Sequence, residues 1–133
     1  MAVIKQFTVQ PNLLPNLLTE SEVQRQVLSY LANAGFLAVR INSGAFMQQG
    51  KRFFRSYWIK NNGKSKGFPD VLALRNNKFL LFEVKAGNGG HISEAQKDFS
   101  KLAKRYFIEV HFVSDLDQVI KIVEEFHGKR TAG

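Results

Sequence analysis

Two acidic residues and a lysine stand out in a segment that is otherwise largely apolar. Residues 68–87 read FPDVLALRNNKFLLFEVKAG, with Asp70 near one end, Glu83 near the other and Lys85 two positions later. Carboxylate oxygens without cysteine or histidine ligands favour a hard divalent cation such as Mg²⁺ or Mn²⁺. If folding brings the carboxylates together, the segment forms a candidate metal site with an ammonium group beside it.

The spacing of the two acids indicates that they meet. Two asparagines, residues 76–77, separate the apolar runs, and asparagine tolerates the positive φ that a two-residue hairpin turn requires. Arg75 then faces Lys78, and the same register places Asp70 opposite Glu83. Directly opposite residues share one face of the sheet, with Cβ atoms about 4.5–5.5 Å apart.

Two facing carboxylates lower the stability of a sheet. Like charges opposite each other destabilise a sheet, and two close carboxylates do not both ionise readily. Lys85 lies on the same face as Glu83 and can neutralise one charge, whereas a bound divalent cation would explain why both acids are present. The alternative is a satisfied Asp–Lys–Glu ion cluster on an exposed face of the sheet.

The first predicted helix offers a third carboxylate. Thr19 and Glu22 form a capping box, apolar residues follow at helical spacing, and Gly35 is placed to end the helix. Glu20 lies in the first turn at the rim of the buried face, where it can face the hairpin site. It is equally explained as an acid at the positive end of a helix. Gln24, one turn later, can hydrogen-bond in the same site or be a plain rim residue.

The sequence predicts one domain at 19–127, an N-terminal arm at 1–18 and a C-terminal tail at 128–133. Ser93 and Gln96 form a second capping box, which predicts a second helix. The other expected elements are a strand at 36–42, one strand across the basic region 45–67, a strand at 107–113 and a last helix from Ser114.

Composition narrows the class of partner. The 133 residues contain no cysteine, which excludes disulfides and thiolate metal sites, and the net charge is +8 with a pI of about 9.9. Such a charge favours a polyanion, most often nucleic acid, over an anionic membrane surface or charge that serves only solubility. No apolar run reaches the roughly 18 residues of a membrane span, and the N-terminus lacks a signal-peptide pattern. We therefore expect no membrane association.

Basic residues gather before the hairpin and on the helix after it. They are expected to contact phosphates, which positions a nucleic acid without specifying its sequence. The predicted contacts, including one asparagine, are Arg40, Asn42, Lys51, Arg52, Arg55, Lys60, Lys64, Lys66, Lys101 and Arg105. The last two share a helix face and are equally explained as a solvated surface. Tyr57 and Trp58 can stack on an unpaired base, or pack in the core of a strand.

These residues together resemble a known family. Pro69-Asp70 followed after twelve residues by Glu83-Val84-Lys85 resembles the PD-(D/E)XK nuclease signature, which alone is degenerate. The wider pattern resembles the VRR-NUC branch of that superfamily, whose small stand-alone members occur in phages and bacteria. It comprises Thr19-Glu20-x-x-Val23-Gln24, Arg40-Ile41-Asn42-Ser43-Gly44, Lys66-Gly67-Phe68-Pro69-Asp70, Phe82-Glu83-Val84-Lys85 and Ser93-x-x-Gln96.

The resemblance implies a fold and a metal site. The fold would be α/β (α+β), a restriction-endonuclease-like core with a central mixed sheet flanked by helices, in the order αβββ(β)αβα. Asp70, Glu83 and the main-chain carbonyl of Val84 would bind Mg²⁺ or Mn²⁺, and Glu20 would complete the site. The basic and aromatic segment 45–66 is not fixed by any of these motifs.

The resemblance also implies catalytic roles. Lys85 would orient or deprotonate the attacking water and steady the phosphate. Gln96 would contact the site from the second helix, with Gln24 alongside, although the capping box already accounts for Gln96.

The expected function is Mg²⁺-dependent hydrolysis of DNA phosphodiesters by a structure-selective endonuclease. Small members of the family act as homodimers on branched DNA such as four-way junctions, and we expect a homodimer in the cytoplasm of a bacterial or phage-infected cell. One alternative is a sequence-selective homing or restriction-type endonuclease. Another is a non-catalytic nucleic-acid-binding module. RNA remains open as a substrate.

Overall fold

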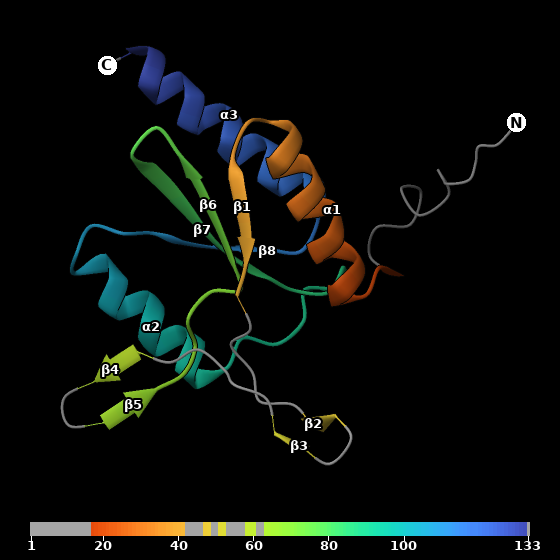
Figure 1. The fold of residues 1–133 in the computed structure, drawn as a ribbon, viewed down its shortest axis with the longest axis vertical. Helices are drawn as coiled ribbons and strands as arrows, with labels where there is room; N and C mark the ends of the chain where they lie inside the picture. Colours follow the sequence, from red (N-terminus) through yellow and green to blue (C-terminus); the bar gives the residue numbers. More distant parts are fainter. Residues whose placement is uncertain (1–16, 42–46, 49–50, 53–57, 61–62, 133) are drawn as a thin grey trace, which may run out of the picture.

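The computed structural model describes residues 17–41, 47–48, 51–52, 58–60 and 63–132 (Figure 1). Along the described residues, seven short strands follow the first helix, and one strand separates the second helix from the third. The helices are α1 (Glu20–Asn33), α2 (Glu94–Lys104) and α3 (Leu116–Ala132). The strands are β1 (Leu37–Arg40), β2 (Met47–Gln48), β3 (Lys51–Arg52), β4 (Trp58–Lys60), β5 (Gly63–Ser65), β6 (Val71–Arg75), β7 (Lys78–Val84) and β8 (Val110–Val113).

The main sheet has four strands in the order β1-β6-β7-β8. β1 pairs with β6 and β6 with β7 in antiparallel fashion, whereas β8 runs parallel to β7 after the crossover through α2. Helices flank both faces, with α1 and α3 on one side and α2 on the other (Figure 1). The expectation of an α+β domain with a central mixed sheet flanked by helices is confirmed at this level.

Two apolar clusters hold the layers together. The larger lies between the sheet and helices α1 and α3, and α1 contributes Val23, Val27 and Leu31 at helical spacing. The smaller lies between the sheet and α2 and centres on Leu81, Ala103 and Val110. β7 runs between the clusters and is buried from Leu80 to its end, which accounts for its nearly continuous apolar sequence.

The predicted starts of the first two helices and the predicted end of the first are confirmed, whereas the last helix begins at Leu116 instead of Ser114. Thr19 and Glu22 exchange hydrogen bonds at the start of α1, and Ser93 and Gln96 do the same at the start of α2. Gly35 has a φ of 95° directly after the C-cap of α1, a conformation that glycine adopts without steric cost. Both helix N-termini are therefore fixed by local sequence, which matters because both adjoin the candidate site.

Three expectations about strands are wrong in detail. The region 45–67 contains two small antiparallel ribbons, β2–β3 and β4–β5, instead of one strand across its middle. The predicted strands at 36–42 and 107–113 are shorter, because Phe36 turns into the core and Phe107 has a φ of 62°. A left-handed residue cannot continue an extended strand, so β8 begins only at Val110.

No helix in the described part of the chain is long and apolar enough to cross a membrane. The described residues also leave six large apolar side chains exposed, which are Leu17, Leu37, Leu74, Phe79, Tyr106 and Phe107. Tyr106 follows the end of α2 and is largely in solvent.

Candidate functional site

The β6–β7 hairpin has the register that the turn residues predict. Both turn residues, 76–77, have positive φ values of 51° and 65°, as a primed turn requires. The ladder pairs Val71 with Phe82, so Asp70, one residue before Val71, lies opposite Glu83. The two acids are buried, at 6% and 3% exposure, which excludes the alternative of an ion cluster on an exposed sheet face.

Asp70 is held by two donors from distant parts of the chain. Its Oδ1 accepts a hydrogen bond of 3.0 Å from the backbone N–H of Val84, at the end of β7. Its Oδ2 accepts a bond of 3.0 Å from Nε2 of Gln24, on the second turn of α1. The Val84 bond fixes the carboxylate across the hairpin, and the Gln24 bond links it to α1.

Glu83 and Lys85 are tied together through α2. Oε2 of Glu83 accepts a bond of 2.8 Å from Nε2 of Gln96 and lies 3.7 Å from Nζ of Lys85. Nζ of Lys85 donates to Oε1 of Gln96 and to the carbonyl oxygen of His91, both at 2.7 Å. Lys85 is buried, at 6% exposure, and its ammonium group therefore has a fixed position beside the carboxylates.

Gln96 serves the helix cap and the acidic site at once. Its Oε1 accepts the backbone N–H of Ser93 at 3.0 Å as well as the Lys85 ammonium, while its Nε2 donates to Glu83. These three bonds leave one orientation of the amide that satisfies all partners. The two explanations offered for Gln96, helix capping and contact with the site, are both correct.

Burial and nearby negative charges raise the pKa of both acids. Burial raises the pKa of Asp70 to about 6, against the opposing bonds from Val84 and Gln24, and the nearby charge of Glu20 adds to the rise. The pKa of Glu83 is raised to about 8, first by burial and then by the charge of Asp70, while Lys85 opposes the rise. The pair therefore resists full ionisation at neutral pH unless additional positive charge enters the site.

Glu20 lies at the edge of this cluster. It is exposed in the first turn of α1, and its charge raises the pKa of both Asp70 and Glu83. Its carboxylate is thus near enough to interact with both acids, although no hydrogen bond joins it to them among the described residues. Glu20 therefore lies both in the positive first turn of a helix and beside the acidic site, as each of the two explanations expected.

The donor set fits a hard cation with water in its remaining positions. Among the described residues, no group of three or more histidine, aspartate or glutamate side chains is arranged to hold a metal ion. Mg²⁺, however, commonly uses one or two carboxylates and keeps several waters. Oε1 of Glu83 is buried without a hydrogen-bond partner in the described structure, so an acceptor is left for a cation or a proton.

Backbone contacts bring the two helix N-termini to the same end of the sheet. Gly67, with a φ of 99°, packs so closely on the carbonyl oxygen of Ala95 that a Cβ at position 67 would clash with it. On the other side, the N–H of Gly87 donates to the carbonyl oxygen of Leu18 at 2.8 Å, just before α1. The carboxylates consequently lie between two positive helix ends.

Of the predicted nucleic-acid contacts whose side chains the structure describes, two lie on segments next to the carboxylates and two lie toward or just past the far end of α2. Arg40 is exposed and pairs with Val71, the neighbour of Asp70, and Lys66 is exposed in the loop before the hairpin. Arg105 is exposed nine residues beyond Gln96, about 13 Å along the helix direction at 1.5 Å per residue. Lys101 is likewise exposed, toward the distal end of α2.

Several predicted contacts lie outside the described side chains. Asn42, Arg55 and Tyr57 fall outside the described residues, and the same holds for the side chains of Lys51, Arg52, Lys60 and Lys64. Trp58 is described, and its Nε1 donates to the carbonyl oxygen of Lys66 at 2.7 Å while its ring packs edge-on against Phe99. Its packing against α2 supports the structural explanation over base stacking.

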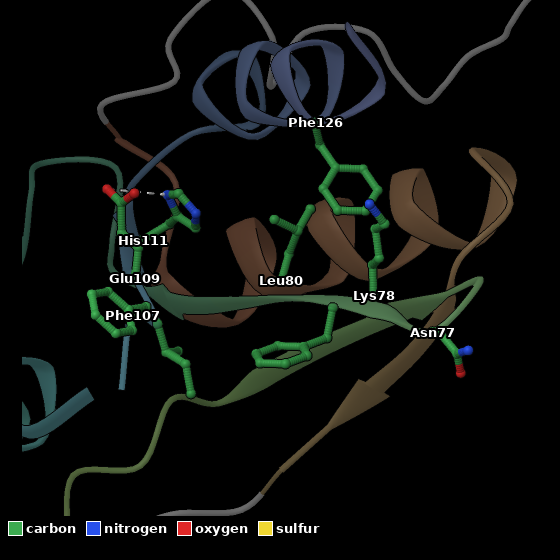
Figure 2. A pocket seen from close by; sticks show the side chains of 9 residues that line it. Asn77, Lys78, Leu80, Phe107, Glu109, His111 and Phe126 are labelled. Carbon is green, nitrogen blue, oxygen red and sulfur yellow. Dashed lines mark ion pairs between the residues drawn. The ribbon is translucent and has the colours of Figure 1, made fainter. Parts of the chain in front are cut away.

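A further cavity lies away from the acids. It encloses about 400 Å³ beside the turn end of β7, and Figure 2 shows Lys78 and Leu80 of β7 directed toward Phe126 of α3. Glu109 and His111 form its other wall, with an ion-pair distance of 3.9 Å. Its lining contains no convergent carboxylates, so size alone does not locate the chemistry of this protein.

Two residues near the acids were not predicted from the sequence. Ser21 and Arg25 line a smaller cavity that also includes Gln24. Gln24 and Arg25 follow Ser21 by three and four residues on α1, so the sequence could have indicated that the three side chains share one helical face. The sequence does not indicate that β1 approaches that face.

The candidate site thus joins two buried carboxylates, a fixed lysine and two glutamines, supplied by a hairpin and the N-termini of two helices. Glu20 and Arg40 lie beside it at the surface. Comparison of the chain with protein-family models, curated proteins and solved structures finds no match.

Proposed function

We propose that this protein is a Mg²⁺-dependent endonuclease that hydrolyses phosphodiester bonds in DNA. The observation that carries the proposal is the buried pair of Asp70 and Glu83 beside the fixed ammonium of Lys85, with Oε1 of Glu83 lacking a hydrogen-bond partner among the described residues. A merely structural ion cluster would be expected to satisfy every buried oxygen.

The proposed metal ligands are Asp70, Glu83 and the carbonyl of Val84, with Glu20 at the open edge. The chemistry that a divalent cation supplies at such a site is Lewis-acid activation of water and of the phosphate. Mn²⁺ has the same preference for oxygen ligands and is expected to substitute. Ionisation of both acids, which burial opposes, becomes favourable when a cation is present.

The chain's own groups have distinct proposed roles. Lys85 steadies negative charge on the phosphate and orients the attacking water, because Gln96 and the carbonyl of His91 hold its ammonium group in place. Gln96 also holds Glu83, and Gln24 holds Asp70. Both glutamines are positioning residues, since each acts through the acid or lysine that it binds.

The architecture supports a restriction-endonuclease-like core and membership of the VRR-NUC family as part of this proposal. The support consists of helix α1 before the sheet, the acids on the β6–β7 hairpin, and helix α2 crossing from β7 to its parallel neighbour β8. The motif residues Glu20, Gln24 and Gln96 lie at the end of the sheet where the acids are.

The substrate we propose is branched DNA, such as a four-way junction, cut by a homodimer. The chain's net charge of +8 favours a polyanion, and the exposed Arg40 and Lys66 lie on segments that adjoin the acids. A bacterial or phage-infected cytoplasm is the proposed setting.

One experiment tests the proposal directly. Supercoiled, linear, single-stranded and four-way-junction DNA, and a matched RNA, are incubated with the protein and Mg²⁺, Mn²⁺ or EDTA. We expect cutting with either metal, none with EDTA, and preference for the junction. Cutting of one linear sequence would instead indicate a sequence-selective enzyme, and binding without cutting in any metal would indicate a non-catalytic module.

Salt dependence tests whether phosphates dominate binding. Because lysine and arginine contacts release counterions, the logarithm of the DNA affinity should fall linearly and steeply as the logarithm of salt concentration rises. Fluorescence anisotropy with labelled junction DNA and EDTA measures this without cleavage. Affinity that stays flat between low and moderate salt would contradict a basic footprint.

A further inference from the structure

A smaller and more polar cavity adjoins the carboxylates. It encloses about 260 Å³ and is lined by Ser21, Gln24, Arg25, Leu28 and Arg40. Four of these residues follow one face of α1 at spacings of three, four and seven, and Arg40 faces them from the end of β1. The volume equals that of several water molecules, at about 30 Å³ each, and is slightly below that of a pocket for a whole ligand.

The cavity and the acidic site share a wall. Gln24 lines the cavity and donates its Nε2 hydrogen bond to Oδ2 of Asp70. Arg40 pairs in the sheet with Val71, and the following residue, Ile41, donates its N–H to the carbonyl oxygen of Asp70 at 2.7 Å. A group in the cavity is therefore separated from the acidic site by little more than one side-chain amide.

The lining has the chemistry of an anion site. It contains two guanidinium groups, a hydroxyl and an amide, and no carboxylate. Within the described part of the chain, neither arginine forms a hydrogen bond or ion pair, although Arg25 is near enough to Glu22 to lower the pKa of that acid. Oε1 of Glu22 accepts the N–H of Thr19 at 2.8 Å, and no carboxylate among the described residues forms a hydrogen bond or ion pair with either guanidinium group.

We propose that this cavity binds a second phosphate of the substrate strand, next to the one that is cut. The inference rests on the proposed nuclease function and deepens it, because it names the ligand of a subsite beside the acids. Arg25 and Arg40 would hold the phosphate oxygens, with the hydroxyl of Ser21 as a further donor. The substrate is then a strand with at least two adjacent phosphates.

A small two-phosphate ligand tests the subsite without cleavage. Thymidine 3′,5′-bisphosphate carries phosphates one nucleotide apart, whereas thymidine 5′-monophosphate and 3′-monophosphate carry one each. Isothermal titration calorimetry with Ca²⁺ present compares the three. We expect the wild-type protein to bind the bisphosphate about tenfold more tightly than either monophosphate, since charge-assisted contacts to exposed arginines are at the low end of their range.

The variants R25Q and R40Q should each reduce this preference, and R25Q/R40Q together should abolish it. The matched control is K121Q, which removes one positive charge from an exposed position on α3 and should keep the preference. A bisphosphate preference that survives in R25Q/R40Q, or that is absent from the wild type, would overturn the subsite.

The outcome is separable from that of the nuclease proposal. Oligonucleotides with one uncharged methylphosphonate beside the cut bond should be cleaved more slowly by the wild type, and R25Q/R40Q should not distinguish them from all-phosphate DNA. If the wild type cleaves both DNAs equally, the subsite fails while the nuclease stands. If no DNA is cleaved but the calorimetric preference depends on both arginines, the subsite stands and the nuclease fails.

Discussion

The two ends of the β6–β7 hairpin contain like-charged pairs that the protein treats differently. At the turn end Arg75 faces Lys78, and Arg75 turns away to donate to the carbonyl oxygen of Ala34 at 3.0 Å and to lie over the Phe36 ring. At the other end Asp70 and Glu83 stay together, and burial disfavours their charges.

The difference shows where the fold tolerates electrostatic cost. The turn end is exposed and its geometry follows from two asparagines, so it can relax into solvent or onto a helix end. The acidic end is buried and is held by donors from α1 and α2, so it has no such freedom. Strain of this kind is often retained at functional sites because function requires it.

The largest expected effect is a loss of DNA cleavage when a residue at the acidic end of the hairpin is replaced. D70N or K85A should lower the rate of junction cleavage by at least about 10²-fold, because each removes a charge aimed at the reacting groups. DNA affinity in EDTA, measured by anisotropy, should change little. The control D117N removes an exposed carboxylate on α3 and should cut normally. Normal cutting by both D70N and K85A would refute the site.

The next effect concerns pH and stability of the metal-free protein. The folded-state pKa of Glu83, about 8, exceeds its usual value of 4.5, so the folded state holds the proton more tightly than the unfolded state. The stabilisation from this group is therefore complete below about pH 4.5 and is lost as pH rises through about 8. Each pKa unit corresponds to about 1.4 kcal/mol, so the loss reaches at most a few kcal/mol.

Urea unfolding in EDTA at several pH values measures this loss. Wild-type stability should decline between weakly acidic and weakly alkaline pH, and the E83Q variant should show a shallower decline because glutamine does not titrate. Mg²⁺ should restore wild-type stability at alkaline pH, since a ligand that binds only the folded state stabilises it. Parallel pH profiles for wild type and E83Q would contradict the assigned shift.

A smaller effect is expected at the turn end. N76V or N77V should each lower the free energy of unfolding by about 1–2 kcal/mol, because a β-branched residue does not accept positive φ readily. Thermal or urea unfolding measures the change. N77G, which accepts the same φ, is the matched control and should stay near wild type. Equal losses for N77V and N77G would show that the backbone conformation is not the cause.

The smallest effect is expected from a change at Phe107, which lines the cavity of about 400 Å³. Phe107 has a φ of 62° and is 99% exposed, so its side chain gains little from packing (Figure 2). F107G should raise the free energy of unfolding by less than about 1 kcal/mol, since relief of the left-handed strain slightly exceeds the entropy cost of glycine. Y106G, at an adjacent exposed residue without positive φ, should lower it.

Sequence reasoning succeeded where the responsible interactions are short in range. The asparagine turn sets the hairpin register, and each capping box uses residues three apart, so these features do not depend on the rest of the fold. The prediction that Asp70 faces Glu83 followed from the turn alone. The prediction of a single strand across 45–67 was wrong because the short ribbons there carry no sustained periodicity. The predicted strand start at Phe107 was wrong because nothing in the sequence marks a non-glycine residue as having a positive φ.

The sequence by itself determined the helix starts, the hairpin register and the acidic pair, because hydrogen bonds between near neighbours and the two-residue period of a strand specify them. Only the tertiary structure decided how that pair is supplied with donors. Gln24 and Asp70 are 46 positions apart, and Gln96 reaches Glu83 and Lys85 across the loop after β7. Burial, the shifted pKa values and the arginine-lined cavity arise from packing between layers, which no local pattern encodes.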